Sequence, residues 1–105
     1  MEIKFDKEYL RELYVLGKAK DKKHRFQPDI IRKFQRCIAI LKAVHRVEDL
    51  FKYSGLCYEV LHGDKHGLES VRVNNQYRIE FKTTMVVSET VVTICRIIEL
   101  SNHYK

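Results

Sequence analysis

Cations recur at alternating positions in the second half of the chain, a pattern that could hold an anion. Arg72 lies in one alternating segment, and Arg78 and Lys82 lie in the next. A guanidinium offers a planar fork of donors and stays protonated at any useful pH, so it suits a phosphate group or a developing negative charge. Acid–base chemistry would also need a group that titrates near neutrality, and His62 and His103 can supply one.

Carboxylates nearby offer a different role for these cations, namely structural ion pairs. Glu69, Glu80 and Glu99 lie in the same alternating segments and are the available partners. Like charges on one exposed face repel, whereas mixed charges stabilise each other, so a cluster of cations favours an anionic ligand over internal pairing. Both interpretations remain open from the sequence.

A zinc site is a further possibility, because histidine and cysteine are the usual zinc ligands. Cys57, His62, His66 and Cys95 would be the ligands, but their spacing matches no standard finger or ribbon. We therefore expect no metal site and no cofactor. With Cys37, the cysteines number three, an odd count without a CxxC pair, which argues against a disulfide framework and for a reducing cytosol.

The size and charge of the chain narrow its class. Its 105 residues suffice for a single domain spanning residues 1–105, and a hydrophobic share of 45% is ordinary for a globule. The net charge of +6 favours a polyanion, chiefly nucleic acid, or an acidic protein partner. No apolar stretch approaches the roughly 20 residues of a membrane span, and the N-terminus lacks a signal-peptide pattern. We expect a cytoplasmic protein without a membrane partner.

The first half of the chain predicts two helices after a short strand at residues 3–5. Asp6 is a good N-cap and Gly17 a good terminator for the first helix, and Pro28 suits the first turn of the second, whose pattern runs to about Leu50. Between them, residues 18–25 carry five Lys or Arg and His24, either as a solvated loop or as an arm that touches phosphates or a partner. The apolar positions at helical spacing are Tyr9, Leu10, Leu13, Leu16, Ile30, Ile31, Phe34, Cys37, Ile38, Leu41 and Val44.

The second half predicts four strands, at residues 57–62, 69–74, 76–83 and 91–100. Asn74 and Asn75 form a credible tight turn, because asparagine tolerates left-handed conformations. The order β-α-α-β-β-β-β indicates an α+β fold in which a helical hairpin covers one face of a twisted antiparallel sheet. The side chains expected to face the helices are Val71, Val73, Tyr77, Ile79 and Phe81, which leaves the cations on the open face.

Residues 61–81, LHGDKHGLESVRVNNQYRIEF, resemble the HigB group of the RelE/ParE toxin superfamily. In that group a Gly-Asp turn leads into a strand, a tight turn and an aromatic-Arg-Ile-x-Phe strand. The ending IIELSNHYK, residues 97–105, is similar to the HigB tail, where a final strand delivers a histidine. The resemblance implies the β-α-α-β-β-β fold, cleavage of messenger RNA in the ribosomal A site, and a hetero-oligomer with a HigA-like helix-turn-helix antitoxin.

Position by position, the resemblance implies three catalytic residues. Arg78 matches the arginine of the YRI motif, His103 matches the terminal histidine, and His62 stands where relatives often have a basic residue. Glu59 and Ser101 stand where well-known relatives have a histidine and an aspartate, so the full acid–base set is not reproduced. The residues implied to hold RNA are Lys65, Arg72, Lys82 and Tyr104.

The implied reaction needs no metal ion, because the 2′-hydroxyl of the RNA attacks the adjacent phosphorus and expels the 5′-oxygen. In this scheme Arg78 stabilises the phosphorane and His103 transfers protons, with His62 the second candidate. Two alternatives remain. One is a ParE-like toxin that inhibits a topoisomerase without chemistry, and the other is a non-catalytic nucleic-acid-binding module.

Overall fold

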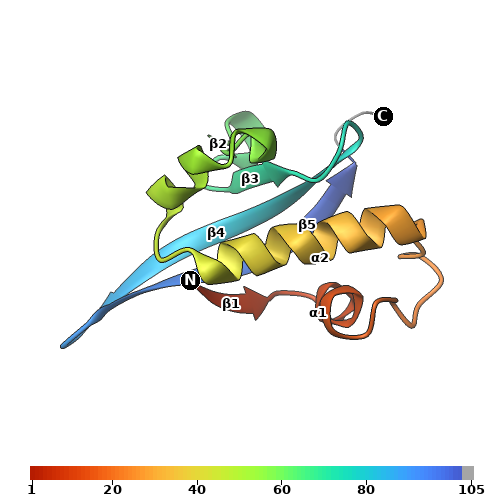
Figure 1. Cartoon of the computed structure of the whole chain (residues 1–105), viewed down its shortest axis with the longest axis horizontal. Helices are drawn as coiled ribbons and strands as arrows, with labels where there is room; N and C mark the ends of the chain where they lie inside the picture. Colours follow the sequence, from red (N-terminus) through yellow and green to blue (C-terminus); the bar gives the residue numbers. More distant parts are fainter. Residues whose placement is uncertain (103–105) are drawn as a thin grey trace.

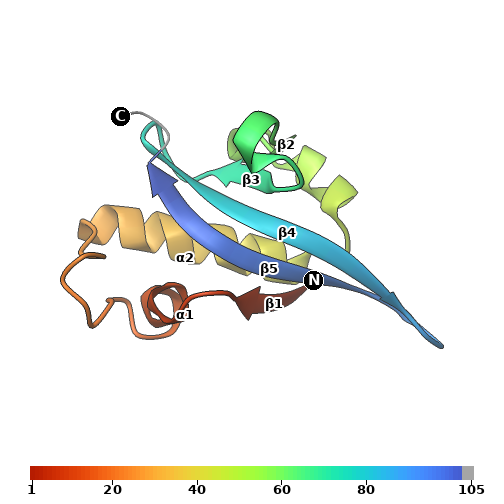
Figure 2. The same ribbon diagram turned by 180° about the vertical axis from the view of Figure 1, so that it is seen from behind.

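A computed structural model describes residues 1–102, so that His103 and Tyr104 lie outside the described residues. Two helices, α1 (Glu8–Val15) and α2 (Pro28–Ala43), lie over one face of a five-stranded sheet (Figure 1). The opposite face of the central strands has no helix over it (Figure 2). The predicted α+β class is confirmed.

The sheet has the spatial order β1-β5-β4-β3-β2. Its strands are β1 (Glu2–Phe5), β2 (Glu59–Val60), β3 (Glu69–Arg72), β4 (Tyr77–Val87) and β5 (Val91–Asn102). β1 runs parallel to β5, and every other pairing is antiparallel. The sheet is therefore a four-stranded antiparallel meander with one parallel strand added by the crossover through the helices.

Alternation along the strands separates the core from the open face as predicted. Val71, Ile79 and Phe81 are fully buried on the helix side. The helix residues that pack in the same core are Tyr9, Leu10, Leu13, Ile30, Phe34, Cys37, Ile38 and Leu41. The irregularity in the β4–β5 pairing leaves Ile98 as the extra residue of β5, because Glu80 pairs with Glu99 and Phe81 with Ile97. The alternation of β4 is therefore undisturbed.

Both helices differ at one end from the prediction. The N-cap of α1 is Lys7, not Asp6, because the backbone N–H of Asp6 still bonds Ile97 and extends the β1–β5 pairing. α2 ends at Ala43, where Val44 turns to extended backbone, instead of continuing to about Leu50. The apolar pattern continues because short 3-10 turns carry it, η1 (Val47–Lys52) and η2 (Ser54–Leu56). In Figure 1, α1 is seen end-on while α2 runs across the view, so the helices cross.

The strands of the second half also differ in length from the prediction. Only Glu59–Val60 of the expected strand 57–62 pairs, because Cys57 has a left-handed φ of 46° and the 3-10 turn η3 (Gly63–Lys65) follows. β4 and β5 run on to Val87 and Val91 and form a hairpin arm that projects from the body (Figure 1). Among residues 1–102 no helix has the length and apolar character needed to cross a membrane.

Candidate functional site

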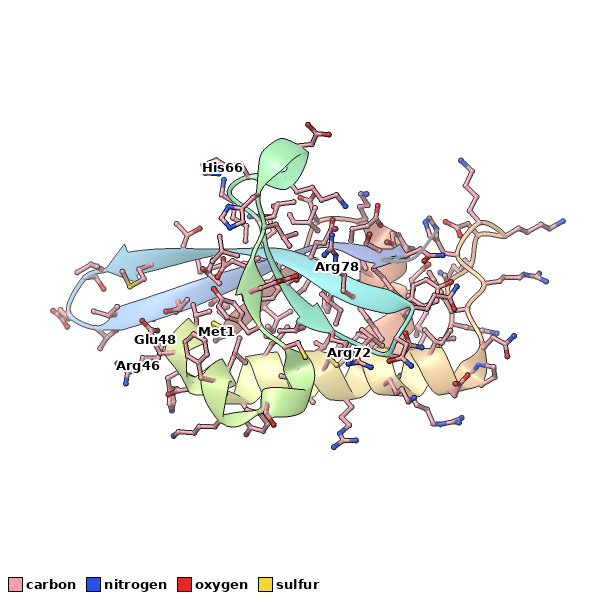
Figure 3. All side chains as sticks on the ribbon, turned by 90° about the horizontal axis from the view of Figure 1, so that it is seen from above. Met1, Arg46, Glu48, His66, Arg72 and Arg78 are labelled. Atoms are coloured by element: carbon pink, nitrogen blue, oxygen red, sulfur yellow. The ribbon has the colours of Figure 1, made fainter. Side chains whose placement is uncertain are left out.

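Arg78 lies on the open face near the start of β4, directly opposite Arg72 of β3. Its side chain is 18% exposed, so most of the guanidinium is withdrawn from solvent. Figure 3 shows Arg78 on the strands of the sheet and Arg72 nearer α2. Two like charges directly opposite each other on neighbouring strands repel, which leaves this part of the sheet receptive to an anion.

Two carboxylates flank Arg78, so the open face is not purely cationic. The Arg78 Nη1 atom lies 3.6 Å from Glu59 Oε1, and its Nε atom lies 3.6 Å from Glu80 Oε2. Glu80 also accepts a hydrogen bond from Lys65, and its side chain is only 4% exposed. The structural pairing that the sequence left open is thus present at Glu80, whereas Glu69 binds Tyr58 and Thr83 instead.

The two carboxylates differ in how they meet Arg78. Glu80 is buried under Lys65 and Arg78 and orients both cations. Glu59, on the edge strand β2, has a side chain that is 58% exposed, and its Oε1 atom lies near the Nη1 atom of Arg78. Its carboxylate is therefore accessible to a ligand that binds at Arg78.

One donor of Arg78 is left over. Within the described residues its Nε atom is buried and has no hydrogen-bond partner, since Glu80 stands beyond hydrogen-bond distance. A buried donor that is not satisfied costs about 1–3 kcal/mol, more when the group is charged. The Nε atom faces Glu80 and is closed to solvent, so a ligand would meet the other nitrogens of the guanidinium, of which Nη1 lies 3.6 Å from Glu59.

Two hollows meet at Arg78. The larger has a volume of about 520 Å³ and is lined by His24, Lys65, Arg78, Glu99, Leu100, Ser101 and Asn102. The smaller has a volume of about 220 Å³ and is lined by Cys57, Glu59, Ser70, Arg72, Asn74, Asn75, Tyr77 and Arg78. Arg78 lines both hollows, so a chain-like anion can place a phosphate at this residue and a neighbouring group in each hollow.

His24 lines the larger hollow, a placement that sequence reasoning missed. Its ring stacks on Tyr9 with centroids 3.6 Å apart, and its Nδ1 atom lies 2.9 Å from an oxygen of Asp21. Phe26, two residues later, packs edge-on against Tyr77 with centroids 5.4 Å apart. These aromatic contacts anchor the basic loop 18–25 to the sheet while its lysines stay exposed.

Glu99, which lines the larger hollow, is held in place by a buried phenol. Tyr9 donates to Glu99, which also accepts from Lys7 at 2.9 Å. Burial, reinforced by the carboxylate, raises the pKa of Tyr9 far above its ordinary range. Burial opposes ionisation of Glu99, yet the bonds from Tyr9 and Lys7 outweigh it and lower the pKa of this carboxyl. Tyr9 therefore remains a donor and Glu99 an anion near neutrality.

The predicted site residues fall into three groups. Arg78, Arg72 and Lys65 meet around the hollows. His62 and Lys82 are exposed and line neither hollow among the described residues. The residues considered for zinc are not brought together, since Cys95 is fully buried while Cys57 is exposed, and residues 1–102 contain no cluster of three or more His, Cys, Asp or Glu arranged for a metal.

Known proteins are similar to this one over most of the chain. A family model described as the RelE-like toxin of the type II toxin-antitoxin system HigB matches residues 3–94. The chain belongs to the HigB toxin family. It is 35% identical over 83 residues to Toxin HigB-1 of Vibrio cholerae, an alignment that covers 78% of this chain and 83% of that toxin. As a HigB-family toxin of a type II system, it has an antitoxin partner.

Solved structures share the fold of this HigB-family chain. A YoeB/ParE toxin from Agrobacterium tumefaciens superposes with a TM-score of 0.57 at 15% identity, covering 99% of this chain and all of that one. A mutant of YafQ from E. coli superposes with a TM-score of 0.54 at 12% identity, covering 97% and 92%. At these identities the likeness concerns the fold alone.

Proposed function

We propose that this HigB-family toxin cuts messenger RNA on the ribosome, with the scissile phosphate bound at Arg78. The observation that carries the proposal is the placement of Arg78 between two hollows, with its guanidinium held beside Glu59 and Glu80. A guanidinium so placed can bind two oxygens of a phosphate in its ground state and hold them more tightly as charge accumulates on the phosphorane. RNA, with a phosphate at every nucleotide, fits a hollow on each side.

The nucleophile in this proposal is the 2′-hydroxyl of the RNA itself. Its oxygen bonds to phosphorus, the bond from phosphorus to the 5′-oxygen breaks, and the products carry a 2′,3′-cyclic phosphate and a 5′-hydroxyl. No metal ion is required to generate the nucleophile, because the RNA supplies it. Only a base, an acid and a cation are needed.

Glu59 is the base that the geometry favours. Its exposed carboxylate lies beside Arg78, within reach of a ribose whose phosphate rests on the guanidinium. A carboxylate can accept the 2′-hydroxyl proton, and the ion pair with Arg78 orients this one. The signal in the sequence was the presence of Glu59 at the position where relatives have a histidine.

His103 is the proposed acid for the leaving 5′-oxygen. It directly follows Asn102, which lines the larger hollow and ends β5. An imidazolium can protonate the leaving oxygen near neutral pH. His62 ranks second, since among the described residues it lines neither hollow at Arg78. Flanking phosphates would be held by Lys65, Arg72, Lys82 and Tyr104.

Alignment by the ribosome accounts for the proposed dependence on it, because positioning the 2′-hydroxyl in line with the leaving oxygen can supply several kcal/mol of the barrier. The test uses purified ribosomes carrying a defined message. The proposal expects cuts with 5′-hydroxyl ends and none in a message with deoxyribose at the cut site. Intact message together with inhibition of a topoisomerase would overturn it in favour of a ParE-like activity.

The antitoxin is proposed to be a HigA-like helix-turn-helix protein that neutralises the toxin and represses the operon. The support is membership of the HigB family and the basic surface of the chain, with its net charge of +6. Copurification of the toxin with the product of a neighbouring reading frame tests this pairing. A partner of unrelated fold would contradict it.

A further inference from the structure

A third hollow lies at the C-terminal end of β3, where Arg72 and Val73 line it and Arg78 does not. It has a volume of about 430 Å³ and lies between α2 and the 3-10 turns η1 and η2. Its floor is apolar, made by Cys37, Ile40, Leu56 and Val73. Its exposed rim carries Lys33, Arg36, Lys52, Tyr53 and Arg72. We call this hollow the edge groove.

Three of the four cations of the edge groove lack a partner among the described residues, and the fourth, Arg72, bonds Asn74 and Asn75. Within residues 1–102, the side chains of Lys33, Arg36 and Lys52 make no ion pair and no hydrogen bond, and no carboxylate lines the groove. Other exposed cations of the described residues, such as Arg32 and Lys42, also make no ion pair, so the edge groove is distinguished by the apolar floor that its cations surround. Four cations around an apolar floor, without a counter-charge, form a surface that attracts a polyanion with a flat apolar part.

Arg72 connects the edge groove to the site at Arg78. It lines both the edge groove and the smaller hollow, and the β3–β4 turn holds its guanidinium through bonds to Asn74 and Asn75. Arg78 in turn joins the smaller hollow to the larger one. Each hollow therefore shares an arginine with the next, and the two arginines lie opposite each other on paired strands, where Cα atoms stand about 5 Å apart.

We propose that the edge groove is a nucleotide subsite for the strand that is cut, and that it takes a nucleotide on the 3′ side of the scissile phosphate. This inference rests on the proposed function and adds to it a second binding site. Arg36 and Lys52 hold phosphates, the apolar floor receives the base, and the exposed ring of Tyr53 stacks on it. The 3′ side is favoured because the codon on the 5′ side is paired to transfer RNA in the adjacent ribosomal site.

The experiment measures cleavage on purified ribosomes with two messages, one that ends at the cut codon and one extended by about three nucleotides. The wild-type toxin should cut the extended message about tenfold more efficiently at subsaturating toxin, since a stacked base and two phosphate contacts contribute on that scale. The double variant Arg36→Gln with Lys52→Gln should lose this preference. It should cut the short message as the wild type does.

A matched control changes two cations of α2 that lie outside the groove, Arg32→Gln with Lys42→Gln, which should retain the preference. Tyr53→Ala should reduce the preference for the extended message without changing the rate at which the short message is cut. Wild-type cleavage without a preference for length, or an edge-groove variant that keeps it, overturns the subsite alone. A groove variant that loses only antitoxin binding overturns it too and makes the groove a docking site for an acidic protein segment. Absence of all cleavage refutes the proposed function instead.

Discussion

Changing each of the two carboxylates beside Arg78 to glutamine should have different effects, a loss of cleavage rate for Glu59 and a loss of stability for Glu80. Glu59→Gln removes an exposed carboxylate that lies 3.6 Å from the guanidinium, and its side chain is 58% exposed. Exposed ion pairs contribute about 0–1 kcal/mol, so the free energy of unfolding should change by no more than about 0.5 kcal/mol. Removing a general base costs about 10²–10⁴ in rate.

Glu80→Gln is the matched comparison, because it makes the same chemical change inside β4 that Glu59→Gln makes on the edge strand β2. Glu80 is buried and accepts from Lys65 while it lies beside Arg78. Hydrogen bonds to charged groups contribute about 1.5–3 kcal/mol, and the 43% exposure of Lys65 brings the expected loss toward the lower figure. We expect Glu80→Gln to lower the free energy of unfolding by about 1–2 kcal/mol.

The assay pairs urea unfolding, followed by circular dichroism, with single-turnover cleavage on ribosomes at saturating toxin. Glu59→Gln should unfold as the wild type does and cut at least about 100-fold more slowly. A Glu59→Gln variant that cuts at the wild-type rate would refute the assignment of the base. If it were as unstable as Glu80→Gln, Glu59 would instead be a structural partner of Arg78.

Two further outcomes follow from the burial of ionisable groups. Burial raises the pKa of Cys37 to about 11 and that of Cys95 to about 12. Only Cys57 should therefore react with a thiol reagent in the folded protein at pH 8, whereas all three cysteines should react after unfolding. Reaction of two or more cysteines in the folded protein would contradict this. The pKa of Glu99 lies below its ordinary value of 4.5, so its contribution to stability is present above that pH and is lost as the pH falls through the lowered value. Glu99→Gln should therefore make the free energy of unfolding depend less steeply on pH in the acid range. An unchanged acid limb would show that the bonds from Tyr9 and Lys7 do not favour the ionised form.

Local pattern was sufficient to predict the core and the orientation of Arg78. Strict alternation in β4 sets Ile79 and Phe81 toward the helices and Arg78 toward the open face, and the bulge falls in β5 where it does not disturb this order. Periodicity carries no information about partners far apart in sequence. The pairing of Lys65 with Glu80 across 15 residues therefore came only from the structure.

The ends of elements and the loops were harder to predict for the same reason. The apolar positions Val44, Val47 and Leu50 keep a helical spacing, yet they reach the core from an extended residue and a 3-10 turn. The sequence left open whether the loop that carries His24 is solvated or touches a ligand, because nothing local indicates that Tyr9 will hold the imidazole ring beside the site. Tertiary contacts, not local propensity, decide where α2 ends and where the ring of His24 lies.

Arg78 is proposed to stabilise the transition state of RNA cleavage, and the rate at which Arg78 variants cut a message on purified ribosomes tests this role most directly. Arg78→Ala should lower the rate by about 10²–10³, as loss of one preorganised donor does, and Arg78→Lys should recover little because an ammonium lacks the planar fork. His103→Gln should also lower the rate while the fold stays intact. An Arg78→Ala variant that is folded and cuts ribosome-bound message at the wild-type rate would contradict the account.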